Sequence, residues 1–341
     1  IRTLGLSGDA LDDLTLRIKA AARAEADTSV GGGTQRSLVF GGQRGNSGNS
    51  SDSQPIRVLQ ISADGIGTVE EPSNANINAI GPFYDFSNIG SRAPVLRNSN
   101  KIDLVGGENK KLSIDNANTS ETLLGVGTFG EYSDAVFYTG DTNGNSDGGI
   151  YAVTNNGDAQ SDVEVSGTTA VSIAGVGDIN GDGDNEIVFV YKNKQNEQDK
   201  FKIGYLKYNN GEVETIKPVE GHISSANSIG QPAVFDDSVK VPAILSADDG
   251  NTVALLELVT DGSQEEWEST EILNDSSAAQ APLVAVDIDG DRNPDIVYVA
   301  ETDSSSPILK TVDPSRNGPA ARKIVDSEES VIEASTDTGI A

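Results

Sequence analysis

Two segments of the sequence place oxygen-bearing side chains at every second position. The first segment supplies Asp178, Asn180, Asp182, Asp184 and Glu186. The second segment supplies Asp287, Asp289, Asp291, Asn293 and Asp295. Closely spaced carboxylate and amide oxygens are the ligands that Ca²⁺ prefers, since this cation takes about six to eight oxygens, some of them from the backbone. The spacing therefore predicts a calcium site in each segment.

An alternative is that these acidic turns simply face water, as acidic turns do throughout a very acidic protein. Four carboxylates within nine residues repel one another, however, and a bound divalent cation relieves that repulsion. An EF-hand does not fit, because no Glu stands at the twelfth position and the flanking sequences are typical of strands rather than helices.

Short β-branched stretches flank both segments and recur along the chain, separated by Gly, Asn, Asp and Ser. This pattern predicts an all-β fold. Strands that follow a turn begin near residues 38, 102, 135, 186, 241 and 295. Intervals of about 50 residues leave room for four antiparallel strands, which is one blade of a β-propeller. We predict six blades, with five or seven as the margin, and a pair of β-sandwiches is the alternative architecture.

The two ends of this array are expected to complement each other. Little chain precedes the first predicted strand near Leu38, so the first blade lacks an inner strand of its own. Residues 331–341 form a surplus apolar stretch after the last blade. A strand from this stretch is expected to complete the first blade and close the ring, which removes exposed sheet edges.

The two acidic segments resemble the FG-GAP or VCBS-type repeat of integrin-α-like β-propellers, whose turn reads Asp-x-Asn-x-Asp-Gly-x-x-Asp. The first segment matches at Asp178, Asn180, Asp182 and Gly183, with Glu186 in place of the last Asp. The second matches at Asp287, Asp289, Asp291 and Asp295, with Arg292 where the repeat has Gly. The resemblance implies Ca²⁺ as the cofactor, a main-chain oxygen ligand from Asp184 and Asn293, and an adhesive function. Rings of this family usually have seven blades.

The N-terminal residues have a different pattern of apolar residues from the rest of the chain. Leu11, Leu14 and Ile18 follow a helical spacing, which predicts one amphipathic helix over residues 9–26. We expect residues 1–33 to form this helix and a Gly linker, either packed on the main domain or serving as the stem of a surface filament or membrane anchor. Residues 34–341 then form the propeller, in which residues 41–54 are a low-complexity surface loop.

The net charge of the chain limits the kinds of partner that it can bind. There are 53 Asp and Glu against 24 Lys and Arg, which gives a formal charge of -29. Such a surface repels phosphate groups, so nucleic acid and anionic membrane surfaces are excluded as partners. The longest apolar stretches are also much shorter than the roughly 18 residues that a membrane span needs, so no membrane insertion is expected.

An acidic excess of this size is typical of proteins from extreme halophiles, and the alternative is an acidic secreted protein of a mesophile. Concentrated salt shortens the Debye length to about 3 Å and weakens repulsion between carboxylates. We therefore expect the fold to be lost in dilute buffer and kept in molar KCl. A melting temperature that is the same in both solutions contradicts the halophilic origin.

No constellation of catalytic residues accompanies the acidic turns. His222 is the single histidine and lacks a Gly-x-Ser-x-Gly partner motif, and no phosphate-binding Gly motif is present. We expect a non-enzymatic, extracellular or cell-surface calcium-binding propeller from a halophilic archaeon or its virus. Its partners are then a protein or glycan on a cell surface, or further copies of itself. The alternative is a polysaccharide-active hydrolase or lyase that uses two of the many carboxylates.

Overall fold

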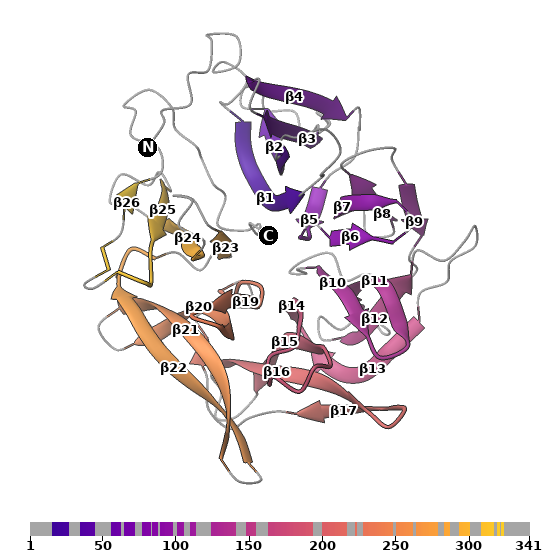
Figure 1. The fold of residues 1–341 in the computed structure, drawn as a ribbon, viewed down its shortest axis with the longest axis vertical. Helices are drawn as coiled ribbons and strands as arrows, with labels where there is room; N and C mark the ends of the chain where they lie inside the picture. The colour runs from indigo at the N-terminus through magenta and orange to yellow at the C-terminus, as the bar shows by residue number, and fades with distance from the viewer. Residues whose placement is uncertain are drawn as a thin grey trace.

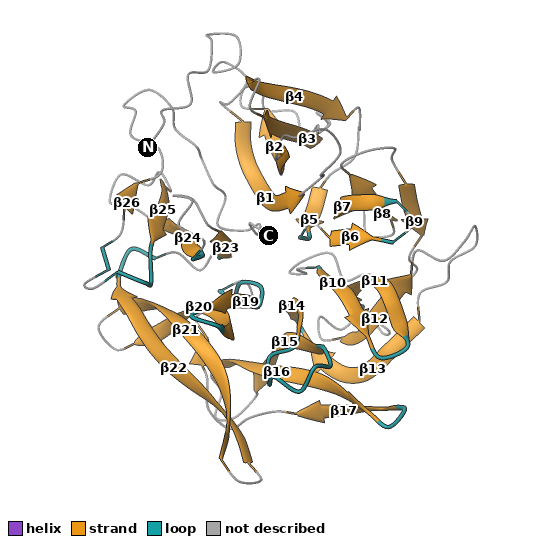
Figure 2. Cartoon of the chain, viewed as in Figure 1, coloured by secondary structure: helices purple, strands orange, loops and turns teal. Residues whose placement is uncertain are grey.

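The structure is a computed structural model of the chain, and its described part consists of strands, turns and loops without a helix (Figure 2). The described residues are 16–26, 35–44, 56–62, 65–71, 77–82, 84–87, 89–97, 101–105, 110–113, 124–140, 148–154, 163–193, 200–216, 222–223, 228–247, 250–261, 264–278, 283–286, 293–300, 308–316, 319–320 and 322–323. Within them, no helix is long and apolar enough to cross a membrane.

The first three sheets are formed by strands that follow one another in the sequence. Sheet 1 contains β1 (Leu16–Ala26), β2 (Gln35–Arg44), β3 (Ile56–Ser62) and β4 (Gly65–Glu71). Sheet 2 contains β5 (Ile77–Ile80), β6 (Tyr84–Phe86), β7 (Gly90–Arg97), β8 (Lys101–Val105) and β9 (Lys110–Ser113). Sheet 3 contains β10 (Gly125–Phe129), β11 (Tyr132–Thr139), β12 (Gly148–Thr154) and β13 (Val163–Ala170).

The other three sheets repeat this order. Sheet 4 contains β14 (Ser172–Gly177), β15 (Glu186–Asn193), β16 (Lys200–Asn209), β17 (Glu212–Ile216) and the short β18 (His222–Ile223), which pairs with β16. Sheet 5 contains β19 (Ala233–Phe235), β20 (Ser238–Ala247), β21 (Gly250–Asp261) and β22 (Gln264–Asn274). Sheet 6 contains β23 (Val284–Val286), β24 (Asp295–Ala300), β25 (Ile308–Val312) and β26 (Arg322–Lys323).

The sheets stand around a common centre, with the first strand of each sheet innermost and the last strand toward the outside (Figure 1). Described strand neighbours pair antiparallel throughout. This arrangement is a β-propeller, as the sequence predicts. Sheets 2 to 6 are five blades with described side chains, and sheet 1 is described by the pairing of its strands.

Apolar side chains fill the space between neighbouring sheets. Separate clusters of buried residues join sheets 2 and 3, sheets 3 and 4, sheets 4 and 5, and sheets 5 and 6. In β15, Ile187 and Phe189 point toward sheet 3, whereas Val188 and Val190 point toward sheet 5. Successive strand residues point to opposite faces, so a strand buried on both faces needs an unbroken apolar sequence. This explains the continuous apolar stretch that starts at Ile187.

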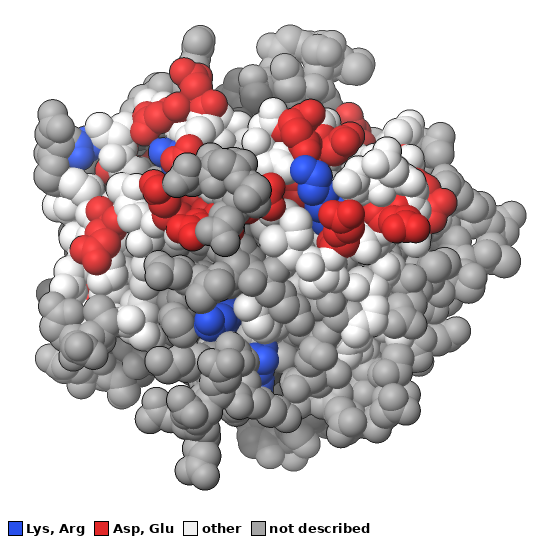
Figure 3. Space-filling model, turned by 90° about the horizontal axis from the view of Figure 1, so that it is seen from below, with Lys and Arg blue, Asp and Glu red and all other residues white. Residues whose placement is uncertain are grey.

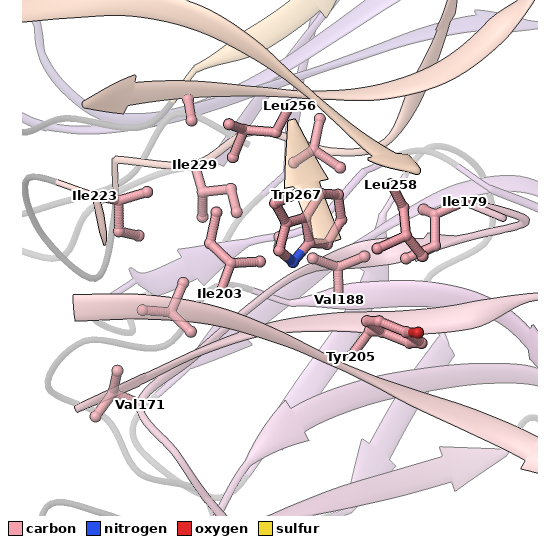
Figure 4. Close-up of a cluster of buried hydrophobic side chains, with 14 residues drawn as sticks. Val171, Ile179, Val188, Ile203, Tyr205, Ile223, Ile229, Leu256, Leu258 and Trp267 are labelled. Atoms are coloured by element: carbon pink, nitrogen blue, oxygen red, sulfur yellow. The ribbon is translucent and has the colours of Figure 1, made fainter. Parts of the chain in front are cut away.

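The cluster between sheets 4 and 5 contains the single tryptophan, Trp267, on β22. Its ring contacts the edge of the Tyr205 ring, with the ring centroids 6.4 Å apart. Val188 and Leu258 lie close to it in the same cluster (Figure 4). Because the Trp267 side chain is buried between two sheets, it stabilises the fold and does not form an exposed platform for a sugar.

Glycines on the inner strands allow one sheet to approach the next. A Cβ atom on Gly125 would lie 2.8 Å from the Ile173 side chain, and one on Gly175 would lie 2.6 Å from Cδ of Pro232. Separations below 3 Å are far inside van der Waals contact. These glycines are therefore packing residues, in agreement with the absence of a nucleotide-binding fingerprint.

The N-terminal prediction is wrong in its described part, since residues 16–26 form strand β1 instead of a helix and pair with β2. The sequence from Leu16 to Ala26 also alternates apolar residues at even positions with mostly charged residues at odd positions. Its Ala, Arg and Glu content favours a helix locally, but pairing with a neighbouring strand overrides such a weak preference. Residues 9–15 of the expected helix lie outside the described residues.

Strand β1 also supplies the inner strand that the first sheet was expected to lack. The predicted closing strand in residues 331–341 lies outside the described residues, as do residues 45–54 of the predicted surface loop. Residues 41–44 of that loop belong to β2. In sheet 2, the predicted second strand near residue 102 is the third along the path, because β7 precedes it. The division at residue 33 stays a prediction.

Candidate cation site

The loop from Asp178 to Glu186 connects β14 to β15, the two inner strands of sheet 4. Gly181 and Gly183 adopt φ angles of 75° and 93°. Nothing lies within 4 Å of a Cβ atom built on either residue. The loop thus requires these glycines for their left-handed backbone conformation and not for space. The first acidic segment is therefore a tight loop between two strands, as expected.

The Asp178 carboxylate organises the loop by accepting hydrogen bonds from three backbone N–H groups. Its Oδ1 accepts from Gly181 at 2.7 Å and Asp182 at 3.1 Å, and its Oδ2 accepts from Gly183 at 3.0 Å. Asn180 Oδ1 also accepts from the Asp182 N–H at 3.0 Å. Side-chain acceptors that bind N–H groups a few residues ahead fix a tight turn. These hydrogen bonds hold the side-chain oxygens of Asp178 and Asn180, the first and third residues of the acidic segment, on one tight loop.

Glu186 closes the loop at the start of β15 and is completely buried. Its Oε2 accepts a hydrogen bond from the Ile179 N–H at 3.1 Å, whereas its Oε1 has no hydrogen-bond partner among the described residues. Burial raises the pKa of Glu186 to about 8, and the nearby charges of Asp182 and Asp178 raise it further against the Ile179 hydrogen bond. A buried carboxylate oxygen without a partner is costly. A cation beside this oxygen removes that cost.

One basic side chain from outside the loop contacts it, and one amide side chain of the loop contacts a neighbouring sheet. Lys207 Nζ on β16 lies 2.7 Å from Asp182 Oδ2 and forms a salt bridge with it. This contact holds the pKa of Asp182 below its usual value and the pKa of Lys207 above its own. Asn185 Nδ2 donates a hydrogen bond of 2.8 Å to the Thr128 carbonyl of β10, which ties the loop to sheet 3.

Lys207 is a residue that the sequence reasoning missed. Its signal is the strand period, because Ile203 and Tyr205 on β16 face sheet 5 and Lys207 continues the same row. Lys207 can be identified only if β16 is known to pair with β15, because this pairing places the side-chain row of β16 beside the loop that precedes β15. This pairing is not visible in the sequence.

The side chains of the loop fit a cation in type but are not gathered around one point. Across the described ranges, no three His, Cys, Asp or Glu side chains are grouped as a metal centre needs. The carboxylates of Asp178 and Asp182 accept hydrogen bonds from the loop instead. The donor set of carboxylates, an amide oxygen and backbone carbonyls nevertheless suits Ca²⁺ in type, and Glu186 Oε1 is a buried oxygen that lacks a partner within the described part of the chain.

The second predicted site is described only at its end. Asp287, Asp289 and Asp291 lie outside the described residues. Asn293 is exposed in the turn before β24, and Asp295 is buried as the first residue of that strand. Asp295 occupies the same place on β24 as Glu186 does on β15. The correspondence of the two segments therefore holds at the strand that follows each of them.

Acidic side chains continue beyond the loop onto the outer strands. Exposed Glu residues are found at Glu212 and Glu214 on β17 and at Glu266 and Glu268 on β22. Figure 3 shows acidic side chains spread over the upper part of this side of the molecule, with few Lys and Arg among them. Charges on outer strands oppose edge-to-edge pairing with another sheet.

A partly buried polar cluster lies between sheets 5 and 6. Asp275 Oδ2 accepts hydrogen bonds of 2.7 Å from both Tyr298 Oη and Lys310 Nζ, and Asp275 Oδ1 accepts one of 3.1 Å from the Ser277 N–H. Lys310 Nζ also donates to Ser277 Oγ at 2.9 Å. Because Lys310 is paired with a carboxylate, it is not available as a base for the Ser277 hydroxyl. The cluster links two blades.

Comparisons with known proteins support the fold. No protein-family model matches the sequence, and no curated protein matches it. Among solved structures, the chain is similar to a mutant of AofleA from Arthrobotrys oligospora, with 14% identity, a TM-score of 0.51, and coverage of 91% of this chain and 88% of that chain. This likeness shows the fold alone.

Two further solved structures are more distant. The β-propeller domain of the Trilobed protease from Pyrococcus furiosus has 12% identity and a TM-score of 0.41, over 92% of this chain and 98% of that chain. The NanB sialidase from Streptococcus pneumoniae has 11% identity and a TM-score of 0.27, over 97% of this chain and 55% of its own. The strand pairing and the likeness to AofleA together identify the chain as a protein with the β-propeller fold.

Proposed function

We propose that the chain is a non-enzymatic, calcium-binding β-propeller that acts as an adhesion, ligand-binding or assembly module at a cell surface. The observation that carries the calcium part is Glu186 Oε1, a buried oxygen at the end of the acidic loop for which the described residues provide no hydrogen-bond partner. The adhesive part follows from the resemblance of the two acidic segments to FG-GAP-type turns, and it is an analogy between folds.

Oxygen chemistry favours Ca²⁺ over other cations. Side-chain oxygens of Asp178, Asn180, Asp182 and Glu186 and the main-chain oxygen of Asp184 would hold the ion. Neither His nor Cys is part of the loop, so the loop lacks the nitrogen and sulfur ligands of zinc sites. A flexible set of oxygens suits Ca²⁺ better than the strict octahedron of Mg²⁺. The bound ion would supply positive charge that holds the loop against sheet 4.

Calcium is expected to raise the melting temperature of the wild-type protein, and Asp182→Ala is expected to lose most of that gain. A ligand at a hundred times its dissociation constant stabilises the folded state by about 2.7 kcal/mol. Scanning calorimetry with and without EGTA, in a constant salt concentration, measures the effect. Asp85→Ala is a matched control, because Asp85 is an exposed strand residue in sheet 2.

The comparison between the two conditions decides the result. If calcium is bound, Asp182→Ala and wild type differ more in calcium than in EGTA, where the variant loses only the hydrogen bonds of Asp182 and its salt bridge with Lys207. Equal losses in both conditions contradict ligation by Asp182. Glu186→Gln provides a second variant, since it keeps the shape of the side chain and removes its charge; it should weaken calcium binding without weakening the metal-free fold.

The surface function is tested by binding and by turnover. The calcium-loaded protein is screened on glycan arrays and on cell-surface extracts, and its native form is imaged for filaments. Soluble polysaccharides are screened in parallel for product release. Calcium-dependent binding without turnover supports a binding module. Turnover that is abolished by one carboxylate substitution outside the two acidic segments overturns it in favour of a hydrolase or lyase.

A further inference from the structure

A positively charged side chain of the protein, Lys207 on β16, already lies beside the acidic loop. Lys207 Nζ lies 2.7 Å from Asp182 Oδ2, and both side chains are partly shielded from water, with exposed fractions of 24% and 37%. The charge of Lys207 also acts on Glu186, and those of Glu186 and Asp184 act on Lys207. A single ammonium group is therefore the counter-ion of several loop carboxylates.

The Asp182 carboxylate has no oxygen left without a hydrogen bond. Its Oδ1 accepts from the Asp184 N–H at 3.0 Å. Its Oδ2 accepts from Asn180 Nδ2 at 3.1 Å and from Lys207 Nζ at 2.7 Å. Oδ2 already accepts two hydrogen bonds, so a divalent cation that binds this oxygen must replace one of them, and a cation that binds Oδ1 lies next to the Lys207 ammonium group on the same carboxylate. The charge-assisted contact with Lys207 is the strongest of the three.

We propose that Lys207 is a built-in competitor of the divalent cation, which stabilises the metal-free loop and thereby sets the calcium affinity of the site. This inference rests on the proposed function. Whether Lys207 leaves Asp182 or stays beside it, an ammonium group close to Ca²⁺ opposes binding because like charges repel at short range in a partly buried setting. Without calcium, the same ammonium group relieves the repulsion between Asp182 and Asp184.

The position of Lys207 makes it a specific competitor. It lies on β16 in the row of Ile203 and Tyr205, whose buried side chains pack between sheets 4 and 5. Packing of this strand fixes where the lysine stem begins, so its ammonium group is directed to the loop and is not one of many mobile surface cations.

The test uses the full chain with Asp291→Ala as background, so that the second predicted calcium segment does not contribute to the signal. In that background, Lys207→Met keeps most of the stem and removes the charge, whereas Lys207→Arg keeps the charge. Lys240→Met is the matched control, because Lys240 also lies on a strand and its acidic partner, Glu257 at 3.6 Å, is not a residue of the loop. Calcium affinity is measured by titration calorimetry, and thermal stability is measured in EGTA.

We expect Lys207→Met to bind calcium about tenfold more tightly and to melt at a lower temperature in EGTA, with Lys207→Arg and Lys240→Met close to the parent protein in affinity. Unchanged or weaker calcium binding by Lys207→Met, while the parent protein still binds calcium, overturns the competitor role and leaves the proposed calcium site standing. Absence of calcium binding in the parent protein and in every variant overturns the proposed calcium site as well.

Discussion

Asp275→Asn is expected to lower the free energy of unfolding by about 3 kcal/mol at pH 7, because it removes the negative charge of a largely buried ion pair and replaces one carboxylate oxygen with an NH2 donor. Asp275 binds Tyr298 of β24 and Lys310 of β25 with the same carboxylate oxygen. In the variant, the Lys310 ammonium group and the Tyr298 hydroxyl keep their desolvation cost and lose the charge that offsets it. Urea unfolding monitored by circular dichroism measures the change.

Asp313→Asn is the matched control for this prediction. Asp313 forms the same kind of turn, in which its Oδ1 accepts from the Ser315 N–H at 2.9 Å, and it also contacts a cation, Arg316. All of these partners lie within three residues, and Arg316 is 44% exposed. An exposed local ion pair contributes at most about 1 kcal/mol. Similar losses in both variants would show that Asp275 caps a local turn and does not join two blades.

The effect of Asp275→Asn is also expected to depend on pH. Hydrogen bonds from Lys310, Ser277 and Tyr298 outweigh the effect of burial and lower the pKa of Asp275 from 3.8 to about 2. A lowered folded-state pKa stabilises the protein above the unfolded-state value, and this contribution is lost as the pH falls toward the folded-state value. The difference in stability between wild type and variant should therefore be constant above pH 5 and narrow from pH 4 toward pH 2. A constant difference over this range contradicts the assignment.

Gly175→Ala is expected to destabilise the protein by about 2 kcal/mol, because the added methyl group meets Pro232 of the next sheet at 2.6 Å. The rigid proline ring and the short inner strand leave little room for relaxation. Gly177→Ala is the control on the same strand, since its Cβ atom would lie 3.3 Å from the same proline. Thermal and urea unfolding of the pair measure the difference. If Gly177→Ala is as unstable as Gly175→Ala, the loss of stability comes from replacing glycine in the strand backbone and not from the contact with Pro232.

The architecture could be predicted because the sequence repeats one local unit. A strand, an acidic turn and a second strand recur at residues 176–190 and 286–299, and the structure has a hairpin loop and two inner strands at the first of these places. Such a unit has apolar residues on both faces and must be covered on both sides. A closed array of similar sheets provides that cover.

Other parts of the structure could not be predicted from local patterns. The residues from Leu16 to Ala26 fit both a helical and a strand spacing, and pairing with β2 decides between them. Lys207 and Lys310 look like ordinary strand residues in the sequence. Their roles depend on acids 25 and 35 residues away in the chain, Asp182 and Asp275. Only the order of strands within and between sheets brings these pairs together.

Trp267, the single tryptophan of the chain, places one indole fluorophore between two neighbouring sheets. Trp267 is buried against Tyr205 between sheets 4 and 5. Its emission shifts to longer wavelength when water reaches the indole, so it reports when sheets 4 and 5 separate around this side chain. If the shift in tryptophan emission precedes the loss of the β-sheet circular dichroism signal, the propeller opens first between sheets 4 and 5. If the two changes coincide, all blades separate together.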